Sequence, residues 1–127
     1  HFVNDSKATN VDAVVRALEC FDRPVVLIMG GRNKGYDFAP LFDHVRARAK
    51  KLIVIGEARE EILAALAQAP AEGAETATDM AEAVRHGYEA ARPGETVLLS
   101  PACASFDMFA NYAQRGEVFR RAVGALA

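Results

Sequence analysis

Short apolar runs recur along the chain, and each is followed by a longer stretch in which apolar residues have helical spacing. The clearest run, residues 25–29, is apolar at every position. This lack of polar alternation is typical of a strand that is covered on both faces. Strands that alternate with helices of this length form a parallel sheet with helices on both faces, and right-handed crossovers make the sheet Rossmann-like. The sequence therefore predicts a three-layer, Rossmann-like α/β domain with a mostly parallel sheet.

The expected elements follow one another without a linker, an internal repeat or a low-complexity segment. Thr9 or Asn10 can cap the first helix, and Asp79 can cap a later one, because short polar side chains accept hydrogen bonds from the first helical N–H groups. Pro24 opens the second strand, and Pro93 turns the chain into the last one. We expect strands at residues 2–3, 25–29, 52–55, 75–77 and 96–99, and helices at residues 10–22, 39–49, 58–69, 79–91 and 114–126.

Length and composition restrict the class of protein. The 127 residues match one ordinary domain, and 51% hydrophobic with 25% charged residues allow a packed core. A net charge of −2 gives no reason to expect a nucleic-acid partner. No apolar run approaches the roughly 20 residues that cross a bilayer, and no secretory signal is seen. Two cysteines far apart do not suggest a disulfide framework. We expect a cytoplasmic monomer without a membrane partner, and the abrupt start in a strand suggests a piece of a longer protein.

The loops that follow the strands are the candidate binding segments, because ligands of open parallel sheets bind at the carboxyl ends of the strands. After the first strand, Asp5, Lys7 and Thr9 alternate at strand spacing and can project to one side. Lys7 could neutralise a phosphate, and Asp5 could accept from sugar hydroxyls or orient Lys7. The alternative is a helix-entry turn in which Thr9 or Asn10 caps and Asp5 pairs with Lys7 in solvent. The residues alone leave both interpretations open.

The second strand ends in Gly30 and Gly31, which can form an anion-binding nest, and Lys34 follows them. This segment matches neither nucleotide-binding glycine motif, so a flexible, solvated turn is the alternative. After the last strand, Ser105 lacks the surroundings of a hydrolase nucleophile, and Cys103 is expected to be a small buried residue rather than a reactive thiol. If the predicted sheet is right, these loops face one crevice.

Three segments resemble one known family: residues 4–10 (NDSKATN), residues 30–35 (GGRNKG) and residues 98–109 (LLSPACASFDMF). They are similar to motifs in the C-terminal domain of the Mur ligases, which add amino acids to peptidoglycan precursors. The first motif resembles the member that adds D-glutamate, since sister ligases carry other residues there. The resemblance covers essentially the whole chain and departs at Arg32 and Asn33.

The resemblance implies an ATP-dependent amide ligase of cell-wall synthesis. ATP, with Mg²⁺, would phosphorylate the carboxylate of UDP-N-acetylmuramoyl-L-alanine, and the amine of D-glutamate would attack the acyl phosphate. The phosphate-binding loop and the UDP-sugar site would lie on two preceding domains, so residues 1–127 alone would be inactive. No catalytic residue and no metal ligand would lie in this domain. The implied contacts are Asp5 and Lys7 for ATP, Thr9 and Lys34 for one carboxylate of D-glutamate, and Ser105 with backbone N–H groups near Phe106 and Tyr112 for the other.

Two alternatives remain at this stage. The chain could be a free-standing Rossmann-like module that binds a small ligand. It could also be a folylpolyglutamate-synthetase-like domain, which shares the fold, although the segment at residues 100–103 argues against it.

Overall fold

The computed structural model describes residues 1–32, 35, 37–103 and 109–126. Among these residues, the elements alternate between strand and helix along most of the chain. The strands are β1 (Phe2–Asn4), β2 (Val25–Gly30), β3 (Ala49–Ile55), β4 (Ala74–Thr76) and β5 (Thr96–Leu99). The helices are α1 (Val11–Glu19), the 3₁₀ turn η1 (Ala39–Leu41), α2 (Phe42–Arg48), α3 (Arg59–Leu66), α4 (Met80–Ala90) and α5 (Tyr112–Gly124).

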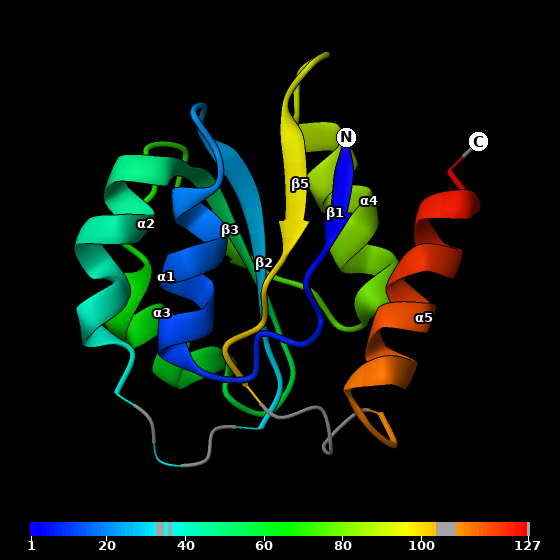
Figure 1. Ribbon diagram of the computed structural model, residues 1–127, viewed down its shortest axis with the longest axis horizontal. Helices are drawn as coiled ribbons and strands as arrows, with labels where there is room; N and C mark the ends of the chain where they lie inside the picture. Colours follow the sequence, from blue (N-terminus) through cyan, green and yellow to red (C-terminus); the bar gives the residue numbers. More distant parts are fainter. Residues whose placement is uncertain (33–34, 36, 104–108, 127) are drawn as a thin grey trace.

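In the described part of the chain, the strands form one five-stranded sheet in the order β1-β5-β2-β3-β4. Every neighbouring pair is parallel. The sheet separates two layers of helices, with α1, α2 and α3 on one side and α4 and α5 on the other (Figure 1). The predicted three-layer α/β architecture is therefore confirmed.

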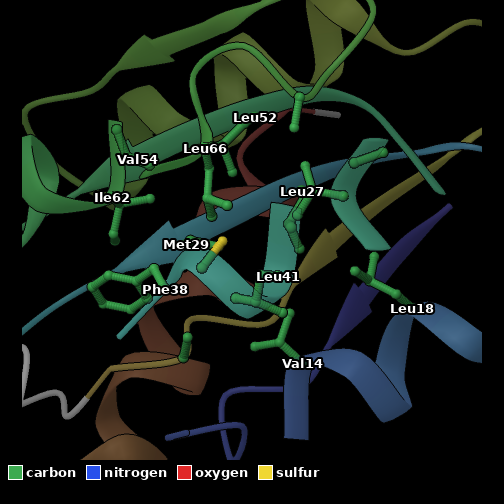
Figure 2. Close-up of a cluster of buried hydrophobic side chains, with 14 of the residues drawn as sticks. Val14, Leu18, Leu27, Met29, Phe38, Leu41, Leu52, Val54, Ile62 and Leu66 are labelled. Carbon is green, nitrogen blue, oxygen red and sulfur yellow. The ribbon is translucent and has the colours of Figure 1, made fainter. Parts of the chain in front are cut away.

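Strand β2 explains why its sequence shows no polar alternation. Val25, Leu27 and Met29 belong to the core under α1, α2 and α3, which is drawn in Figure 2. Val26 and Ile28 belong to the core under α4 and α5. All of these side chains are at most 1% exposed, so both faces of the strand are covered.

Asparagine or aspartate caps start α1, α4 and α5. The side chains of Asn10, Asp79 and Asn111 each accept a hydrogen bond of 2.8 Å from the backbone N–H three residues further on. The sequence predicted the cap at Asp79 and left Thr9 and Asn10 open for α1, where the cap is Asn10. The last helix begins at Tyr112 rather than at residue 114, because Asn111 is its cap.

The boundary between α2 and β3 was predicted wrongly. A helix was expected at residues 39–49, but Pro40 lies in a 3₁₀ turn, α2 ends at Arg48, and β3 starts at Ala49 instead of residue 52. Lys50 and Lys51 interrupt the apolar pattern at the start of this strand. Both charges are paired: Lys50 Nζ lies 2.7 Å from a Glu95 oxygen, and Lys51 Nζ lies 3.6 Å from a Glu75 oxygen. Elsewhere, α3 ends at Leu66 rather than residue 69, and β4 lies one residue earlier than predicted.

Candidate functional site

The loops after β1 and β5 are joined to each other by backbone hydrogen bonds. We call residues 5–9 the β1 turn and residues 100–103 the β5 loop. The N–H of Asp5 donates to the carbonyl of Leu99 (2.8 Å), and the N–H of Ala102 donates to the carbonyl of Ala8 (2.8 Å). These bonds hold the two segments at the carboxyl edge of the sheet, side by side.

The loops after β2 and β3 join the same edge. The N–H of Gly30 donates to the carbonyl of Pro101 in the β5 loop (3.0 Å), and the N–H of Ala58 donates to the carbonyl of Gly31 (2.8 Å). The convergence that the topology predicted is therefore present in the described residues. Four chain segments meet at one edge of the sheet through their own backbones.

Backbone conformations that disfavour a side chain occur at this edge. Gly30 has φ +135°, and a Cβ added there would lie 1.9 Å from the carbonyl oxygen of Ile55, so only glycine fits. Ala102 has φ 65°, a left-handed conformation that is costly for a residue with a Cβ. It is fully buried and is held by its bond to Ala8. Such strain is often found at binding sites.

The β1 turn is folded rather than extended. The N–H of Ala8 donates to the carbonyl of Asp5 (2.9 Å), and the N–H of Thr9 donates to the carbonyl of Lys7 (2.9 Å). The expected strand-like alternation of Asp5, Lys7 and Thr9 is therefore wrong, and the segment is a turn that leads into the cap at Asn10. The alternative of a helix-entry turn is borne out, although its pairing of Asp5 with Lys7 is not: the described partner of Asp5 is the Ser100 hydroxyl, at 3.2 Å.

Asp5 and Lys7 nevertheless lie together, since both line two grooves beside the edge strand β1. The α1 groove, about 430 Å³, lies between β1 and α1 and is mostly apolar; Phe21 and Leu98 are among its walls. The α5 groove, about 390 Å³, lies between the β1 turn and the start of α5, where Tyr112 lines it. The α5 groove is therefore lined by two cations, two carboxylates and a helix N-terminus: Lys7 and Arg120, Asp5 and Glu117, and the start of α5 at Tyr112.

The β1 turn and the start of α5 bring groups of opposite charge to this groove. Burial raises the pKa of the Asp5 carboxyl, and the hydrogen bond from Ser100 partly offsets that rise. Lys7 is exposed. Tyr112 is the first residue of α5, where backbone N–H groups lack helical partners and the helix dipole favours negative charge.

The other predicted contacts are placed less completely. Thr9 is half-buried at the end of the β1 turn, outside the residues that line either groove. Lys34, Ser105 and Phe106 lie outside the described residues. Their proposed contacts remain predictions.

Sequence reasoning missed a buried polar group beside the groove. Ser6 is 5% exposed and Arg115 is 1% exposed, and the arginine donates to the serine. Glu117, two residues further on, pairs with Arg120 and Arg121. The sequence signal for the Arg115 contact was Ser6 itself, because a small residue between Asp5 and Lys7 allows a helix to pack closely against the turn.

Among the described residues, no three histidine, cysteine, aspartate or glutamate side chains come together as a metal site. Cys103 is fully buried, as predicted, and Cys20 is exposed. Within the described ranges, no helix has the length and apolar character that would let it span a membrane.

The parallel sheet and the joined loops at its carboxyl edge define a Rossmann-like α/β domain. The particular family follows from comparison with known proteins. Residues 1–103 match the family model described as Mur ligase, glutamate ligase domain, and the chain belongs to this family.

Relatives from distant bacteria carry one name, UDP-N-acetylmuramoylalanine--D-glutamate ligase. The protein of Salinibacter ruber is 50% identical over 126 residues, which are 98% of this chain and 27% of the relative. The protein of Bordetella pertussis is 52% identical over 126 residues, which are 99% of this chain and 24% of the relative. The chain thus spans about a quarter of the length of the curated relatives it matches.

A solved structure has the same fold. It is a domain from Haemophilus ducreyi that is assigned to a UDP-N-acetylmuramate:L-alanyl-gamma-D-glutamyl-medo-diaminopimelate ligase. The match covers 100% of this chain and 88% of that chain, with a TM-score of 0.56 and 18% sequence identity. At this identity the likeness supports the fold only.

Proposed function

We propose that the chain is the domain of a D-glutamate-adding Mur ligase that binds ATP and D-glutamate and positions them for amide formation. The observation that carries the proposal is the identity of about 50% along nearly the whole chain with ligases of that name. The joined loops at the carboxyl edge of the sheet support it, because they bring Asp5, Lys7 and the start of α5 to one groove. The relatives also favour this function over a folylpolyglutamate-synthetase-like one.

The proposed ATP contacts are Asp5 and Lys7. Lys7 is an exposed cation at the entrance of both grooves, where it can neutralise a phosphate. Asp5 keeps its carboxylate at a fixed place through the Ser100 hydroxyl, 3.2 Å away, so its second oxygen is available to ribose hydroxyls.

The proposed D-glutamate contacts come from separate segments, because a dicarboxylate needs donors at both of its ends. The N-terminus of α5 at Tyr112 presents the backbone N–H groups of a first helical turn, where the helix dipole favours an anion. Thr9 belongs to the β1 turn beside it. The remaining assignments, Lys34, Ser105 and Phe106, rest on the family motifs alone.

In the proposed reaction, ATP phosphorylates the carboxylate of UDP-N-acetylmuramoyl-L-alanine, releasing ADP. The amine of D-glutamate then attacks the acyl carbonyl, and phosphate leaves as the amide forms. This chain would hold the ATP phosphates and align the D-glutamate amine, which lowers the entropic part of the barrier. Mg²⁺ would neutralise charge during phosphoryl transfer, and the proposal assigns it no ligand among the described residues. The full enzyme would be a cytoplasmic, monomeric, three-domain protein with this chain as one domain.

The test uses the full-length protein that contains this chain. We expect ADP release that requires both UDP-N-acetylmuramoyl-L-alanine and D-glutamate. Lys7→Met should raise the KM for ATP. Lys51→Met is the control and should leave this KM unchanged, because Lys51 lies near the amino end of β3, away from the carboxyl edge of the sheet. Residues 1–127 alone should release no ADP. Activity with L-glutamate and a folate, or binding of another ligand without any ligation, would contradict the proposal.

A further inference from the structure

Arg115 is a buried cation in the first turn of α5, between the β1 turn and the β5 loop. Arg115 is 1% exposed, although arginine is among the residue types that are least often buried. The helix places it there because α5 starts at Tyr112, so that Arg115, Gly116 and Phe119 share the inner face of α5. A guanidinium at this place must be satisfied by groups around it.

The guanidinium group of Arg115 bonds to two loops at once. In the β1 turn, Nε donates to the hydroxyl of Ser6 (3.1 Å) and Nη2 donates to the carbonyl of Ser6 (2.8 Å). In the β5 loop, Nη1 donates to the carbonyl of Cys103 (2.8 Å). The planar fork of arginine can satisfy acceptors in these different directions, which a lysine cannot.

Ser6 extends this arrangement back to the helix. Its hydroxyl accepts from Arg115 and donates to the carbonyl of Tyr112 at the start of α5 (2.6 Å). Ser6 is therefore held from both sides, between Asp5 and Lys7 in the sequence. Any shift of the serine would move both of these neighbours.

Close packing leaves little room for the helix to slide. The Asn4 amide donates from Nδ2 to the carbonyl of Gly116 (3.1 Å), and its Oδ1 accepts from the N–H of Ser6 (3.1 Å). A Cβ added at Gly116 would lie 3.0 Å from the Asn4 Nδ2 and 3.2 Å from the Ser6 Cβ. The β1 turn and the start of α5 therefore behave as one packed unit.

We propose that Arg115 is a positioning residue that fixes the β1 turn, the β5 loop and the N-terminus of α5 relative to one another. This proposal rests on the proposed function: it makes the ATP side, at Asp5 and Lys7, and the D-glutamate side, at Tyr112, a single rigid frame. Arg115 acts through Ser6 and Cys103 and touches neither ligand. Its loss would displace both ligand sites together.

The experiment compares Arg115→Lys with Arg121→Lys in the full-length protein. The first variant keeps the charge and loses the fork, while the second changes a side chain on the same helix that is 77% exposed. We expect Arg115→Lys to raise the KM values for ATP and D-glutamate together and to lower kcat/KM on the order of 10- to 100-fold. The Arg121→Lys control should match the wild type. Ser6→Ala should raise both KM values in the same direction, and the double variant should lose less than the product of the two single losses.

Hydrogen exchange of the full-length protein without ligands gives a second readout. In Arg115→Lys, the amides of Ala8 and Ala102, which lie in the β1 turn and the β5 loop, should exchange faster together. A lower Tm with unchanged KM values would show a merely structural role and overturn the proposal, as would faster exchange confined to α5. If the wild type binds neither ATP nor D-glutamate, the proposed function fails, and the exchange result still decides the positioning role.

Discussion

At the scale of single residues, Asp5 is partly buried, and this burial favours its neutral form, while the hydrogen bond from Ser100 favours the charged form. Its pKa is raised from the ordinary value of 3.8 because of burial, so the ionised carboxylate costs stability in the folded protein. This cost is absent below pH 3.8 and appears as the pH rises through the folded-state pKa. A residue that is kept at such a cost is a good candidate for binding.

We therefore predict that Asp5→Asn raises the Tm at pH 7 and weakens ATP binding. The gain in Tm should shrink as the pH is lowered through the folded-state pKa and vanish below pH 3.8, where the wild-type carboxyl becomes neutral in both states. Thermal unfolding at several pH values and ATP titration measure the two effects. Asp22→Asn, an exposed carboxylate in the turn before β2, is the control and should change neither. A lower Tm at pH 7 would contradict the prediction.

Gly30 carries a stronger constraint. An alanine there would add strain at φ +135° and place its Cβ 1.9 Å from the carbonyl oxygen of Ile55. We predict that Gly30→Ala lowers the free energy of unfolding by about 3 kcal/mol or more. Gly94→Ala separates the two causes, because Gly94 has φ +88° with no atom within 4 Å and should cost only about 1 kcal/mol. Urea unfolding measures both; equal losses would show that the contact with Ile55 relaxes.

At the scale of elements, α5 shows what the sequence could and could not reveal. Its apolar pattern predicted a helix, but the inner face of its first turns is formed by Arg115 and Gly116. Neither residue is apolar and large, so periodicity pointed to a start two residues too late. The cap at Asn111 fixes where α5 begins, and the start of the helix places Arg115 on the face that packs against the β1 turn. The sequence alone did not identify this cap. The predicted strand at residues 52–55 was too short for a similar reason, because the charged Lys50 and Lys51 did not fit the apolar pattern of a buried strand.

Helix α5 also allows a matched comparison of two glycines. Gly116→Ala and Gly124→Ala both gain helix propensity, about 1 kcal/mol within a helix and less at its end. Only the first adds a Cβ at 3.0 Å from the Asn4 amide, which hydrogen bonds hold in place. We predict that Gly116→Ala is destabilising by about 1–2 kcal/mol and Gly124→Ala is neutral or slightly stabilising. Urea unfolding of the two variants measures this difference, and equal stabilities would mean that Asn4 yields without cost.

At the scale of the whole molecule, the parallel topology was the most predictable feature, and it also predicted which loops lie together at the candidate site. Once a parallel sheet is inferred, the carboxyl ends of its strands must lie at one edge, so the loops near Asp5 and Gly30 had to converge. The contacts between these loops could not be predicted. The bond from Ala102 to Ala8 and the buried position of Ser6 depend on local turns that no periodicity encodes.

The opposite end of the sheet carries a charge cluster that should affect stability and leave ligand binding unchanged. Lys50 Nζ lies 2.7 Å from a Glu95 oxygen and 3.3 Å from a Glu72 oxygen, and the lysine residue is 7% exposed. The hydrogen bond between Lys50 and Glu95 is the main cause of both pKa shifts, which raise the pKa of Lys50 above 10.5 and lower that of Glu95 below 4.5.

These directions define the pH range in which the cluster stabilises the protein. The contribution of Glu95 is present above pH 4.5 and is lost as the pH falls through its lower folded-state pKa. The contribution of Lys50 is complete below pH 10.5 and is lost as the pH rises through its higher folded-state pKa. We predict that Glu95→Gln lowers the Tm throughout the range between these values, and that the difference from the wild type shrinks below pH 4.5. Thermal unfolding from pH 3 to 9 checks the profile, with Glu89→Gln, an exposed residue of α4, as the control. Glu95 precedes the amino end of β5, whereas Asp5 and Ser100 lie beyond its carboxyl end, so Glu95→Gln should not change the KM for ATP. A changed KM would show that the two ends of the sheet are coupled.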